Sequence, residues 1–297
     1  MRNVSDDGRR LSRKARAWAA MLLCTVVGCA SNGTLDLSGM SFSREPLVGK
    51  VVWNDLITED IDATRRFYGQ LFGWTFENAT GPGRDEYLVA RSGNVYVAGL
   101  VSIAPRADGA ELSRWLPYVS VPDVDASVAR ARAAGGNVAA EARNVNLGRV
   151  AAIVDPDGAV IGLARSNIGD PDDRTTVAAA GRVIWTELLV SDPAAAADFY
   201  RSVVGCGART IERGGGQYTL LTGGGADRAG ILENPSDQAA PRWLTYFGVD
   251  DAAAAAERAA TLGGTIVLPV SPDLRAGTMA VVTDPSGAIL ALREITR

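Results

Sequence analysis

The chain has 297 residues, of which 47% are apolar and 22% are charged, and it contains no histidine. This length and composition are typical of about two globular domains with apolar cores. Because histidine is the commonest metal ligand and general base, its absence excludes a serine hydrolase triad and most zinc, iron and nickel chemistry. Beyond residue 28 the chain has 24 basic and 32 acidic residues. The resulting net charge of −8 argues against binding to nucleic acid.

The N-terminal segment 1–28 has the pattern of an export signal. A basic stretch at 9–16 precedes a short apolar run at 17–27. This run is too short to span a bilayer as a helix but suits a signal peptide. The segment 26–29, Val-Val-Gly-Cys, resembles the lipobox of bacterial lipoproteins. This resemblance implies a lipoprotein signal peptide at 1–28, lipidation of Cys29, and a tether at 29–46. The alternative is an apolar leader with a chance cysteine.

The rest of the chain is an internal duplication. Five motifs of the first copy recur in the same order and at nearly constant spacing in the second. They are Trp53-Asn54-Asp55-Leu56 with Trp185-Thr186-Glu187-Leu188, Phe67-Tyr68 with Phe199-Tyr200, Arg114-Trp115-Leu116 with Arg242-Trp243-Leu244, Gly135-Gly136 with Gly263-Gly264, and Asp155-Pro156 with Asp284-Pro285. The duplication predicts a first domain at 47–166, a linker at 167–181 and a second domain at 182–297.

Each copy divides into two similar halves. In the first half, the pattern predicts a strand at 50–58, a helix capped by Asp60 and ended by Gly73, and short strands near 74–79, 85–91 and 95–103. In the second half, it predicts a strand at 116–121, a helix from Asp123 to residue 134, and three strands ending at 165. The last hairpin turns at 155–158, Asp-Pro-Asp-Gly, which suits a type I turn. The second copy repeats this order.

These motifs carry a resemblance to a known family. Two strand–helix–three-strand modules per copy, the pattern Phe-Tyr-x-x-x-x-Gly-Trp at 67–74 and the closing Asp-Pro-x-Gly hairpin resemble the vicinal oxygen chelate superfamily of glyoxalases, bleomycin resistance proteins and extradiol dioxygenases. The resemblance covers 48–165 and 182–295. It implies an α+β fold of tandem glyoxalase-like domains, in which the two βαβββ modules of each domain form a curled mixed sheet around a cup.

The resemblance also locates the positions where metal-binding members of the superfamily hold their ion. On the first strand of each module this position lies seven residues before the helix cap, and on the closing hairpin it lies four residues after the turn glycine. The residues at these positions are Trp53, Leu116, Gly162, Trp185, Leu244 and Ala291. None of them has a side chain that ligates a metal. We therefore expect no metal and no other cofactor, and no metal-dependent glyoxalase or dioxygenase activity.

Strand alternation places residues i and i+2 on the same face. If the former metal positions face the cup, the cup is lined by aromatic and aliphatic side chains and one carboxylate per copy. The candidate ligand-binding residues are therefore Trp53, Asp55, Leu116, Tyr118, Trp185, Glu187, Leu244 and Tyr246. Asp55 and Glu187 are also the candidate catalytic residues. In the alternative interpretation, the tryptophans fill the core and each carboxylate pairs with an arginine.

Three functions remain open at this point. The favoured hypothesis is a metal-free, membrane-anchored lipoprotein of the cell envelope that binds a small apolar or aromatic molecule in its cups. The second is a metal-independent lyase, isomerase or hydroxylase-like enzyme that uses Asp55 or Glu187 as a general base. The third is a structural surface lipoprotein with filled cups. Cys206, in an apolar context without a basic neighbour, is expected to be a packed and unreactive thiol.

The lipobox gives a direct prediction about location. Replacing the thiol by a hydroxyl (Cys29→Ser) should abolish palmitate labelling in the native host and move the protein from the membrane fraction to the soluble or precursor fraction, because stable anchoring needs two or more acyl chains. If wild type and variant fractionate alike and both retain residues 1–28, the leader is not a lipoprotein signal.

Overall fold

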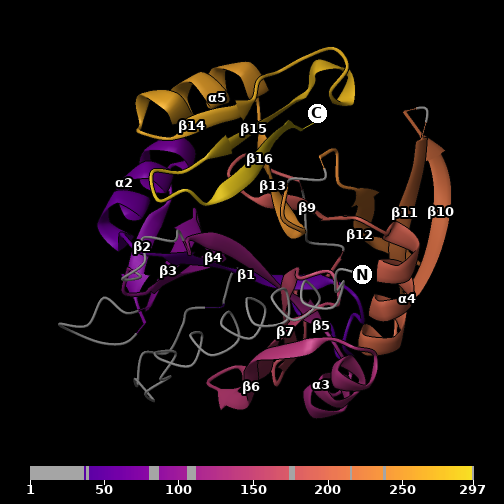
Figure 1. The fold of residues 1–297 in the computed structure, drawn as a ribbon. Coiled ribbons are helices and arrows are strands. Elements are labelled where there is room, and N and C mark those ends of the chain that lie inside the picture. The colour runs from indigo at the N-terminus through magenta and orange to yellow at the C-terminus, as the bar shows by residue number, and fades with distance from the viewer. Residues whose placement is uncertain are drawn as a thin grey trace, which may run out of the picture.

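The two copies fold as two eight-stranded mixed sheets with helices packed against them (Figure 1). The computed structural model describes residues 37, 40–79, 87–105, 112–173, 178–214, 216–236 and 239–295. The predicted signal peptide, Cys29 and most of the predicted tether lie outside these residues. We call the two copies domain 1 and domain 2. The α+β fold expected from the sequence is confirmed.

Domain 1 forms a sheet with the strand order β2-β3-β4-β1-β5-β8-β7-β6. Its elements are β1 (Val51–Thr58), α2 (Ile61–Phe72), β2 (Thr75–Asn78), β3 (Tyr87–Ser92), β4 (Val95–Ser102), β5 (Arg114–Ser120), α3 (Val124–Ala133), β6 (Asn137–Val145), β7 (Gly148–Val154) and β8 (Val160–Ser166). The order strand, helix and three strands therefore occurs twice, as the sequence predicts.

Domain 2 repeats this topology with the strand order β10-β11-β12-β9-β13-β16-β15-β14. Its elements are β9 (Val183–Val190), α4 (Pro193–Val204), β10 (Gly207–Arg213), β11 (Gly216–Gly223), β12 (Ala226–Glu233), β13 (Arg242–Val249), α5 (Ala252–Thr261), β14 (Thr265–Leu268), the 3₁₀ turn η1 (Arg275–Gly277), β15 (Met279–Thr283) and β16 (Ile289–Glu294). The main departure from domain 1 is the segment 269–278, which replaces the long β6–β7 hairpin.

The two modules of one domain are joined through their first strands. β1 pairs antiparallel with β5, with Trp53 opposite Tyr118 and Asp55 opposite Leu116. β9 pairs with β13 in the same way. Sequence alone left open whether modules pair within a copy or across copies, and the sheets pair them within a copy.

The helices begin and end where the sequence predicts. The Asp60 carboxylate accepts a hydrogen bond from the Ala63 amide at 2.8 Å and so caps α2. Gly73 ends this helix in the left-handed region with φ of 70°, which a residue without Cβ adopts at little cost. Asp192 caps α4 in the same way, and Pro193 begins that helix. None of the described helices is both long enough and apolar enough to cross a membrane.

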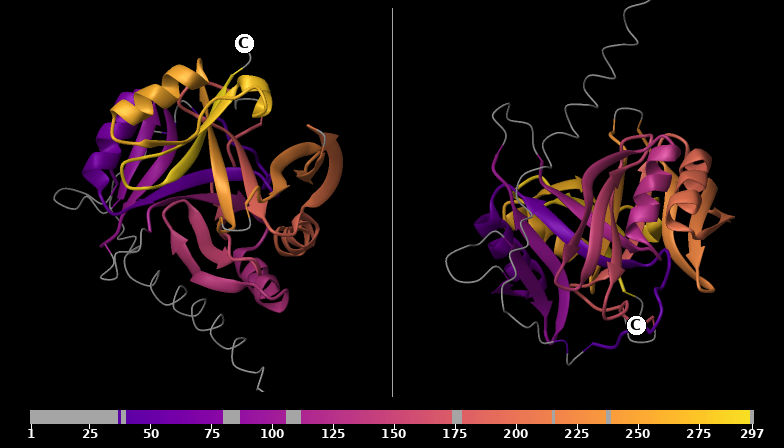
Figure 2. Two further views of the ribbon diagram at one scale, coloured as in Figure 1. Left: turned by 45° about the horizontal axis from the view of Figure 1, so that its top comes forward. Right: turned by 90° about the horizontal axis from the view of Figure 1, so that it is seen from below.

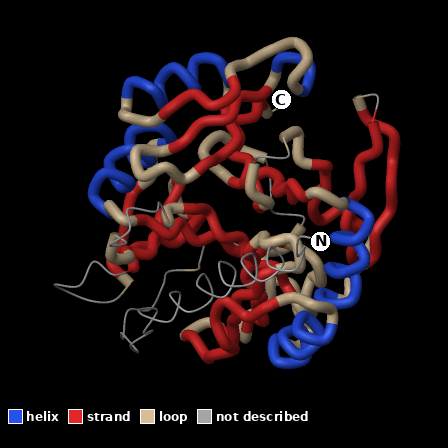
Figure 3. The backbone as a smooth tube through the Cα atoms, viewed as in Figure 1, coloured by secondary structure: helices blue, strands red, loops and turns tan. Residues whose placement is uncertain are grey.

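The helix-bearing faces of the two sheets pack against each other across the domain boundary. Helix α2 lies beside α5, and α3 lies beside α4, so each helix pair combines the two domains (Figures 1 and 2). Two clusters of buried apolar residues accompany these pairs, and each takes residues from both domains. The helices lie at the periphery and the strands between them (Figure 3). The modules thus share a sheet within a domain and a core across domains.

A buried hydrogen-bond chain connects the domains at each helix pair. Trp115 Nε1 donates to the Tyr68 hydroxyl at 3.1 Å, and this hydroxyl donates to Asp284 Oδ2 in domain 2 at 3.3 Å. The second chain is its counterpart, in which Trp243 donates to Tyr200 at 3.1 Å and Tyr200 donates to Asp155 of domain 1 at 2.9 Å. We call these the Trp–Tyr–Asp chains. They explain why the Phe-Tyr and Asp-Pro motifs recur together.

Each helix pair also satisfies carbonyl groups at a helix C-terminus. The Arg130 guanidinium of α3 donates to the Val203 carbonyl of α4, at 3.0 Å from Nη2. The Arg258 guanidinium of α5 donates to the Gln70 carbonyl of α2, at 2.8 Å from Nη2. The last carbonyls of a helix lack partners within the helix and attract cations. These contacts therefore add polar specificity to the apolar packing between the domains.

Asp284 predicts a pH dependence of stability. Burial raises its pKa from the ordinary 3.8 to about 6, so the folded state prefers the protonated carboxyl. The free energy of unfolding should therefore fall as pH rises from about 4 to 6, by about 3 kcal/mol from this group. Asp284→Asn removes the titration. The difference in free energy of unfolding between Asp284→Asn and wild type should therefore increase in favour of the variant as pH rises from about 4 to 6, which urea titrations measure.

The exposed carboxylate of Asp62 offers a control for this experiment. Asp62→Asn, compared with wild type, should show no such pH-dependent gain. A difference between Asp284→Asn and wild type that is constant from pH 4 to pH 6.5, or that decreases, would contradict the assignment.

Candidate functional site

The face of each sheet opposite the shared core carries the polar and aromatic side chains singled out in the sequence. Along β1, Leu56 and Thr58 are fully buried on the core side. Trp53 and Asp55 alternate with them and lie on the curled face. We call the curled face of domain 1, lined by Trp53, Asp55, Tyr87 and Tyr118, cup 1. Cup 2 is its counterpart in domain 2, lined by Trp185, Glu187, Tyr218 and Tyr246.

In cup 1 the Asp55 carboxylate is surrounded by ring donors. Oδ1 accepts hydrogen bonds from Trp53 Nε1 at 2.8 Å and from the Tyr87 hydroxyl at 2.9 Å. Trp53 Nε1 also lies 3.1 Å from the Tyr87 oxygen, and the Tyr118 hydroxyl donates to the same carboxylate. Asp55 is 8% exposed, whereas the three rings are half-buried. Three neutral donors thus position one carboxylate beneath rings that solvent still reaches.

Two glycines provide the space for this arrangement. A Cβ on Gly99 of β4 would lie 2.2 Å from Asp55 Oδ1 and 2.3 Å from the Tyr87 hydroxyl. A Cβ on Gly162 of β8 would lie 2.2 Å from the Tyr118 ring. Both glycines stand in register with the residue they accommodate, since Gly99 pairs with Asp55 and Gly162 with Tyr118. Gly162, a former metal position, therefore accommodates a ring rather than a ligand side chain.

Burial shifts the protonation equilibria in cup 1. Desolvation raises the pKa of Asp55 above its ordinary value, although the hydrogen bonds from Trp53, Tyr87 and Tyr118 and the charge of Arg143 act in the opposite direction. Desolvation also raises the pKa values of Tyr87 and Tyr118, and the neighbouring Asp55 raises them further. The phenols therefore remain protonated donors, and the carboxyl is more basic than an aspartate in water.

In cup 2 an arginine side chain contacts the carboxylate directly. Glu187 is fully buried and accepts hydrogen bonds from Tyr218 at 2.6 Å and from Tyr246. The Arg275 guanidinium forms an ion pair with Glu187 Oε1 and lies 5.4 Å from the centre of the Tyr218 ring. Trp185 Nε1 donates to the Tyr218 hydroxyl at 2.9 Å. The carboxylate of cup 2 is thus paired and covered.

Cup 2 is also filled by larger apolar side chains. The register places Val281 beside Ala291 on the curled face of domain 2, whereas Ala152 and Gly162 hold the matching positions in domain 1. Met279 and Val281 join Tyr246 in an apolar cluster on this face. In contrast to the rings of cup 1, Tyr218 and Tyr246 are 1% and 2% exposed. The two cups therefore share one arrangement of tryptophan and tyrosine rings around a carboxylate, which we call the frame. The tyrosine rings are more exposed in cup 1 than in cup 2.

The structure gathers the sequence candidates into these two cups. Trp53, Asp55 and Tyr118 meet in cup 1, while Trp185, Glu187 and Tyr246 meet in cup 2. Leu116 and Leu244 lie opposite the two carboxylates, at 3% and 4% exposure. The pairing with an arginine, which belonged to the alternative interpretation of the sequence, is observed for Glu187. Among the described residues, no arginine or lysine forms an ion pair with Asp55.

Sequence reasoning missed three residues of the cups. Tyr87 and Tyr218 hold matching positions in the two copies, so a closer comparison of the copies could have found them. Arg275 gave no such signal, because the repeat of the closing strands places Asn146 at its position. Cys206 is half-buried, and desolvation raises the pKa of its thiol to about 11, which agrees with an unreactive side chain.

The donor set of the cups does not fit a metal ion. A transition metal of this fold needs several N, O or S donors that converge on one point. Among the described residues, no three His, Cys, Asp or Glu side chains gather in such a group. The described residues of each cup offer one carboxylate, with indole and phenol neighbours, and those of cup 2 add a cation. The acid–base groups that these residues provide are therefore the carboxylate and the phenols.

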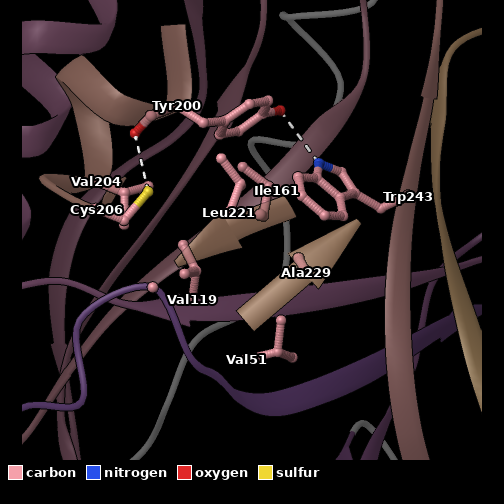
Figure 4. A pocket seen from close by; sticks show the side chains of 10 residues that line it. Val51, Val119, Ile161, Tyr200, Val204, Cys206, Leu221, Ala229 and Trp243 are labelled. Atoms are coloured by element: carbon pink, nitrogen blue, oxygen red, sulfur yellow. Dashed lines mark hydrogen bonds between the residues drawn. The ribbon is translucent and has the colours of Figure 1, made fainter. Parts of the chain in front are cut away.

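A small cavity lies away from both cups, among residues of the two domains. It measures about 10 Å³, and its apolar lining includes Val119, Tyr200, Cys206 and Trp243 (Figure 4). This is about the space of one water molecule, so the cavity is a packing defect rather than a ligand site.

Comparison with known proteins agrees with this architecture. The sequence model of the "Glyoxalase/Bleomycin resistance protein/Dioxygenase superfamily" matches residues 50–163 and again 182–292. The protein "Putative glyoxylase CFP32" of Mycobacterium tuberculosis is 37% identical over 245 residues, which cover 81% of this chain and 92% of that protein. "Anthracycline biosynthesis protein DauV" of Streptomyces is 32% identical over 263 residues, covering 83% and 94%.

Solved structures show the same fold at low sequence identity. The Mn(II)-bound glyoxalase from Novosphingobium aromaticivorans has a TM-score of 0.56 at 18% identity and covers 84% of this chain and 83% of its own. A 2,2′,3-trihydroxybiphenyl 1,2-dioxygenase from Sphingomonas wittichii has a TM-score of 0.54 at 13% identity, with coverage of 84% and 91%. At these identities the likeness concerns the fold alone.

The glycine beneath Asp55 gives a test of the geometry of cup 1. Gly99→Ala should destabilise the protein by about 1–3 kcal/mol, because the added methyl group displaces the Asp55 carboxylate or the Tyr87 hydroxyl. Gly69→Ala in α2 is the matched control, since a Cβ there makes only ordinary van der Waals contacts, at 3.5 Å from the Trp74 carbonyl oxygen and 3.6 Å from the Phe76 ring. This variant should be neutral or stabilising by up to about 1 kcal/mol. Urea unfolding of both variants measures the difference, and equal stability would refute the close approach at Gly99.

Proposed function

The chain belongs to the glyoxalase/bleomycin resistance protein/dioxygenase superfamily, and we propose that it binds a small aromatic molecule in cup 1 without a metal ion. The observation that carries this proposal is the contrast between the cups. In cup 1, half-buried rings surround a carboxylate that forms no ion pair with a described arginine or lysine, although Arg143 acts on it through space. In cup 2, an arginine and larger side chains cover the same frame.

The chemistry of cup 1 suits such a ligand. Trp53, Tyr87 and Tyr118 offer aromatic surface against which a flat molecule stacks. Asp55 and the phenol hydroxyls provide polar groups that orient it. Ala152 on the same face takes less space than its counterpart Val281. Cup 2, in this proposal, is a structural element of the second domain.

The relatives support a flat aromatic ligand. The names of DauV and DnrV place those two Streptomyces proteins in anthracycline biosynthesis, and anthracyclines are polycyclic aromatic compounds. The Mycobacterium tuberculosis relative has the name "Putative glyoxylase CFP32". For this chain we favour binding over a metal-dependent glyoxalase reaction, because neither cup, in the part of the chain that the structure describes, provides the donor set of a metal site.

A second candidate function is metal-independent acid–base catalysis on the bound molecule. The specific observation in its favour is Asp55, whose pKa burial raises and which is not paired with an arginine among the described residues. A carboxylate of raised pKa is a stronger general base near neutral pH. Glu187 does not serve this role in the observed arrangement, because Arg275 holds it in an ion pair. Asp55 is thus the one cup carboxylate that we propose as a base.

We further propose that the protein works at the cell envelope. The support is the lipobox-like segment that ends at Cys29, preceded by a basic stretch and an apolar run. Lipidation there would attach both domains to a membrane, at the outer membrane or facing the periplasm if the source is Gram-negative. The acidic charge of the remaining chain suits a partner that is a small molecule rather than a nucleic acid.

A thermal stabilisation screen with flat aromatic compounds tests the proposed binding. At least one compound should raise the melting temperature, since a ligand at 100 times its Kd stabilises the folded state by about 2.7 kcal/mol. Trp53→Leu should weaken binding at least tenfold, because it removes a stacking surface and a donor to Asp55. Mass spectrometry of the compound after incubation separates the two candidate functions, since an altered mass indicates catalysis.

Trp185→Leu is the matched control, because it makes the same change in cup 2. Binding should persist in this variant. A ligand that is lost in Trp185→Leu and kept in Trp53→Leu would move the site to cup 2. A screen that yields no stabilising compound would oppose the proposal as a whole.

A further inference from the structure

We propose that cup 1 recognises an organic cation, in which an amidinium, guanidinium or ammonium group is attached to an aromatic body. This inference rests on the proposed binding function of cup 1 and names the class of its ligand. The observation behind it is that cup 2 already holds such a group, namely the guanidinium of Arg275, against the equivalent set of side chains.

The placement of Arg275 has the features of cation recognition. Its guanidinium makes an ion pair with the buried Glu187 carboxylate and lies over the face of the Tyr218 ring. A carboxylate combined with an aromatic face is a common site for guanidinium and ammonium groups, because the ring quadrupole attracts positive charge. Arg275 therefore occupies cup 2 as a ligand from the same chain would.

The backbone is strained to deliver this guanidinium. Arg275 and Ala276 both have positive φ angles, 51° and 56°, and neither is a glycine. Two consecutive left-handed residues are unfavourable in L-amino acids and persist only where other contacts compensate. The Arg275 side chain is held by its ion pair with Glu187 and by the Tyr218 ring, and its carbonyl accepts a hydrogen bond from the Thr278 hydroxyl at 2.7 Å. These contacts offset the unfavourable backbone conformation.

Cup 1 repeats this cation-binding frame residue by residue. Both cups have a tryptophan that donates to a tyrosine hydroxyl, two tyrosines that donate to one carboxylate, and a glycine in register with that carboxylate. The pairs are Trp53 with Trp185, Asp55 with Glu187, Tyr87 with Tyr218, Tyr118 with Tyr246, and Gly99 with Gly230. A Cβ on Gly230 would clash with the Tyr218 hydroxyl, as a Cβ on Gly99 would with Tyr87.

The internal cation has no counterpart among the described residues of cup 1. The repeat of the closing strands places Asn146 at the position of Arg275, and this residue is exposed in the turn between β6 and β7. The donors that reach Asp55 are the neutral groups of Trp53, Tyr87 and Tyr118, while the charge of Arg143 on β6 acts on the carboxylate through space. Among the described residues no cation contacts Asp55 directly, and a cationic ligand would supply that contact.

The shorter side chain of Asp55 suits a ligand larger than a bare guanidinium. Aspartate has one methylene group fewer than the Glu187 of cup 2, and the smaller Ala152 stands in place of Val281 on the neighbouring strand. A cationic head on Asp55 would thus leave its aromatic body against the half-buried rings. A buried carboxylate without a cationic partner is costly, so the matching cation should be selected over a neutral molecule of the same shape.

Benzamidine and benzamide form a matched pair of probes for isothermal titration calorimetry with the mature protein. They share a flat aromatic body, but only benzamidine carries a positive charge. We expect benzamidine to bind one site per chain at least tenfold more tightly than benzamide. Asp55→Asn should reduce the affinity for benzamidine at least tenfold, whereas Glu187→Gln, the same change in cup 2, should leave it unchanged.

Arg275→Ala extends the test to the equivalence of the cups. This variant vacates cup 2, so benzamidine should now bind two sites per chain, and methylguanidinium should raise the melting temperature of the variant more than that of wild type. One site in this variant would overturn the assignment of Arg275 as an internal ligand. Should the variant not fold, the comparison of benzamidine with benzamide on wild type still decides the ligand class.

The outcomes separate this inference from the proposed function. If benzamide binds as tightly as benzamidine, cup 1 binds aromatic molecules but does not select cations, and the inference fails alone. If neither probe binds while the aromatic screen yields a ligand that depends on Trp53, the inference again fails and the binding function stands. If neither probe binds and the screen yields nothing, both fail.

Discussion

The arrangement of the whole molecule depends on the two buried Trp–Tyr–Asp chains that cross between the domains. Tyr68 and Tyr200 are fully buried, and each donates its hydroxyl hydrogen to an aspartate at the hairpin turn of the other domain. An unpaired hydroxyl or carboxylate in this position would cost free energy that apolar packing alone does not recover. The chains therefore favour one relative orientation of the domains, in which α2 packs beside α5 and α3 beside α4.

This orientation determines which faces of the sheets are available for function. Because the helix-bearing faces of both sheets are buried against each other, the opposite, curled faces are the ones that can contact a ligand. Strand alternation then separates the roles of neighbouring residues, so that Leu56 packs in the shared core while Asp55, one position before it, lies in cup 1. The same separation in domain 2 assigns Leu188 to the core and Glu187 to cup 2.

The duplication explains how one fold holds two different sites. The frame of rings, carboxylate and glycine is retained in both cups, because each member hydrogen-bonds or accommodates another. One connection in each domain lies outside this frame, namely the one between β6 and β7 in domain 1 and between β14 and β15 in domain 2. In domain 1 it is the regular β6–β7 hairpin, and in domain 2 it is the loop that carries Arg275. The changed connection and the larger side chains of Met279 and Val281 together close one cup, while the other keeps its accessible rings.

Short stretches of the sequence were enough to predict the duplication, the α+β modules, the helix caps at Asp60 and Asp192, and the shared face of Trp53 and Asp55. These features follow from local periodicity, capping chemistry and the two-residue repeat of a strand. The family resemblance supplied the cups, and the replaced ligand positions argued against a metal.

The surroundings of each carboxylate, in contrast, were settled by contacts between distant parts of the chain. Tyr87 lies 32 residues after Asp55, and Arg275 lies 88 residues after Glu187, so neither contact has a local pattern. Arg275 reaches its place through a strained loop that breaks the repeat, and no alternation or spacing predicts such a path. The pairing of modules was likewise open in the sequence. In the structure, modules of the same domain pair through their strands, whereas modules of different domains pack through their helices. Each module has one sheet edge and one apolar helix face, and either could be covered by a module of the same copy or of the other copy. Burial and long-range hydrogen bonding resolved that choice, because they depend on residues that only the folded chain brings together.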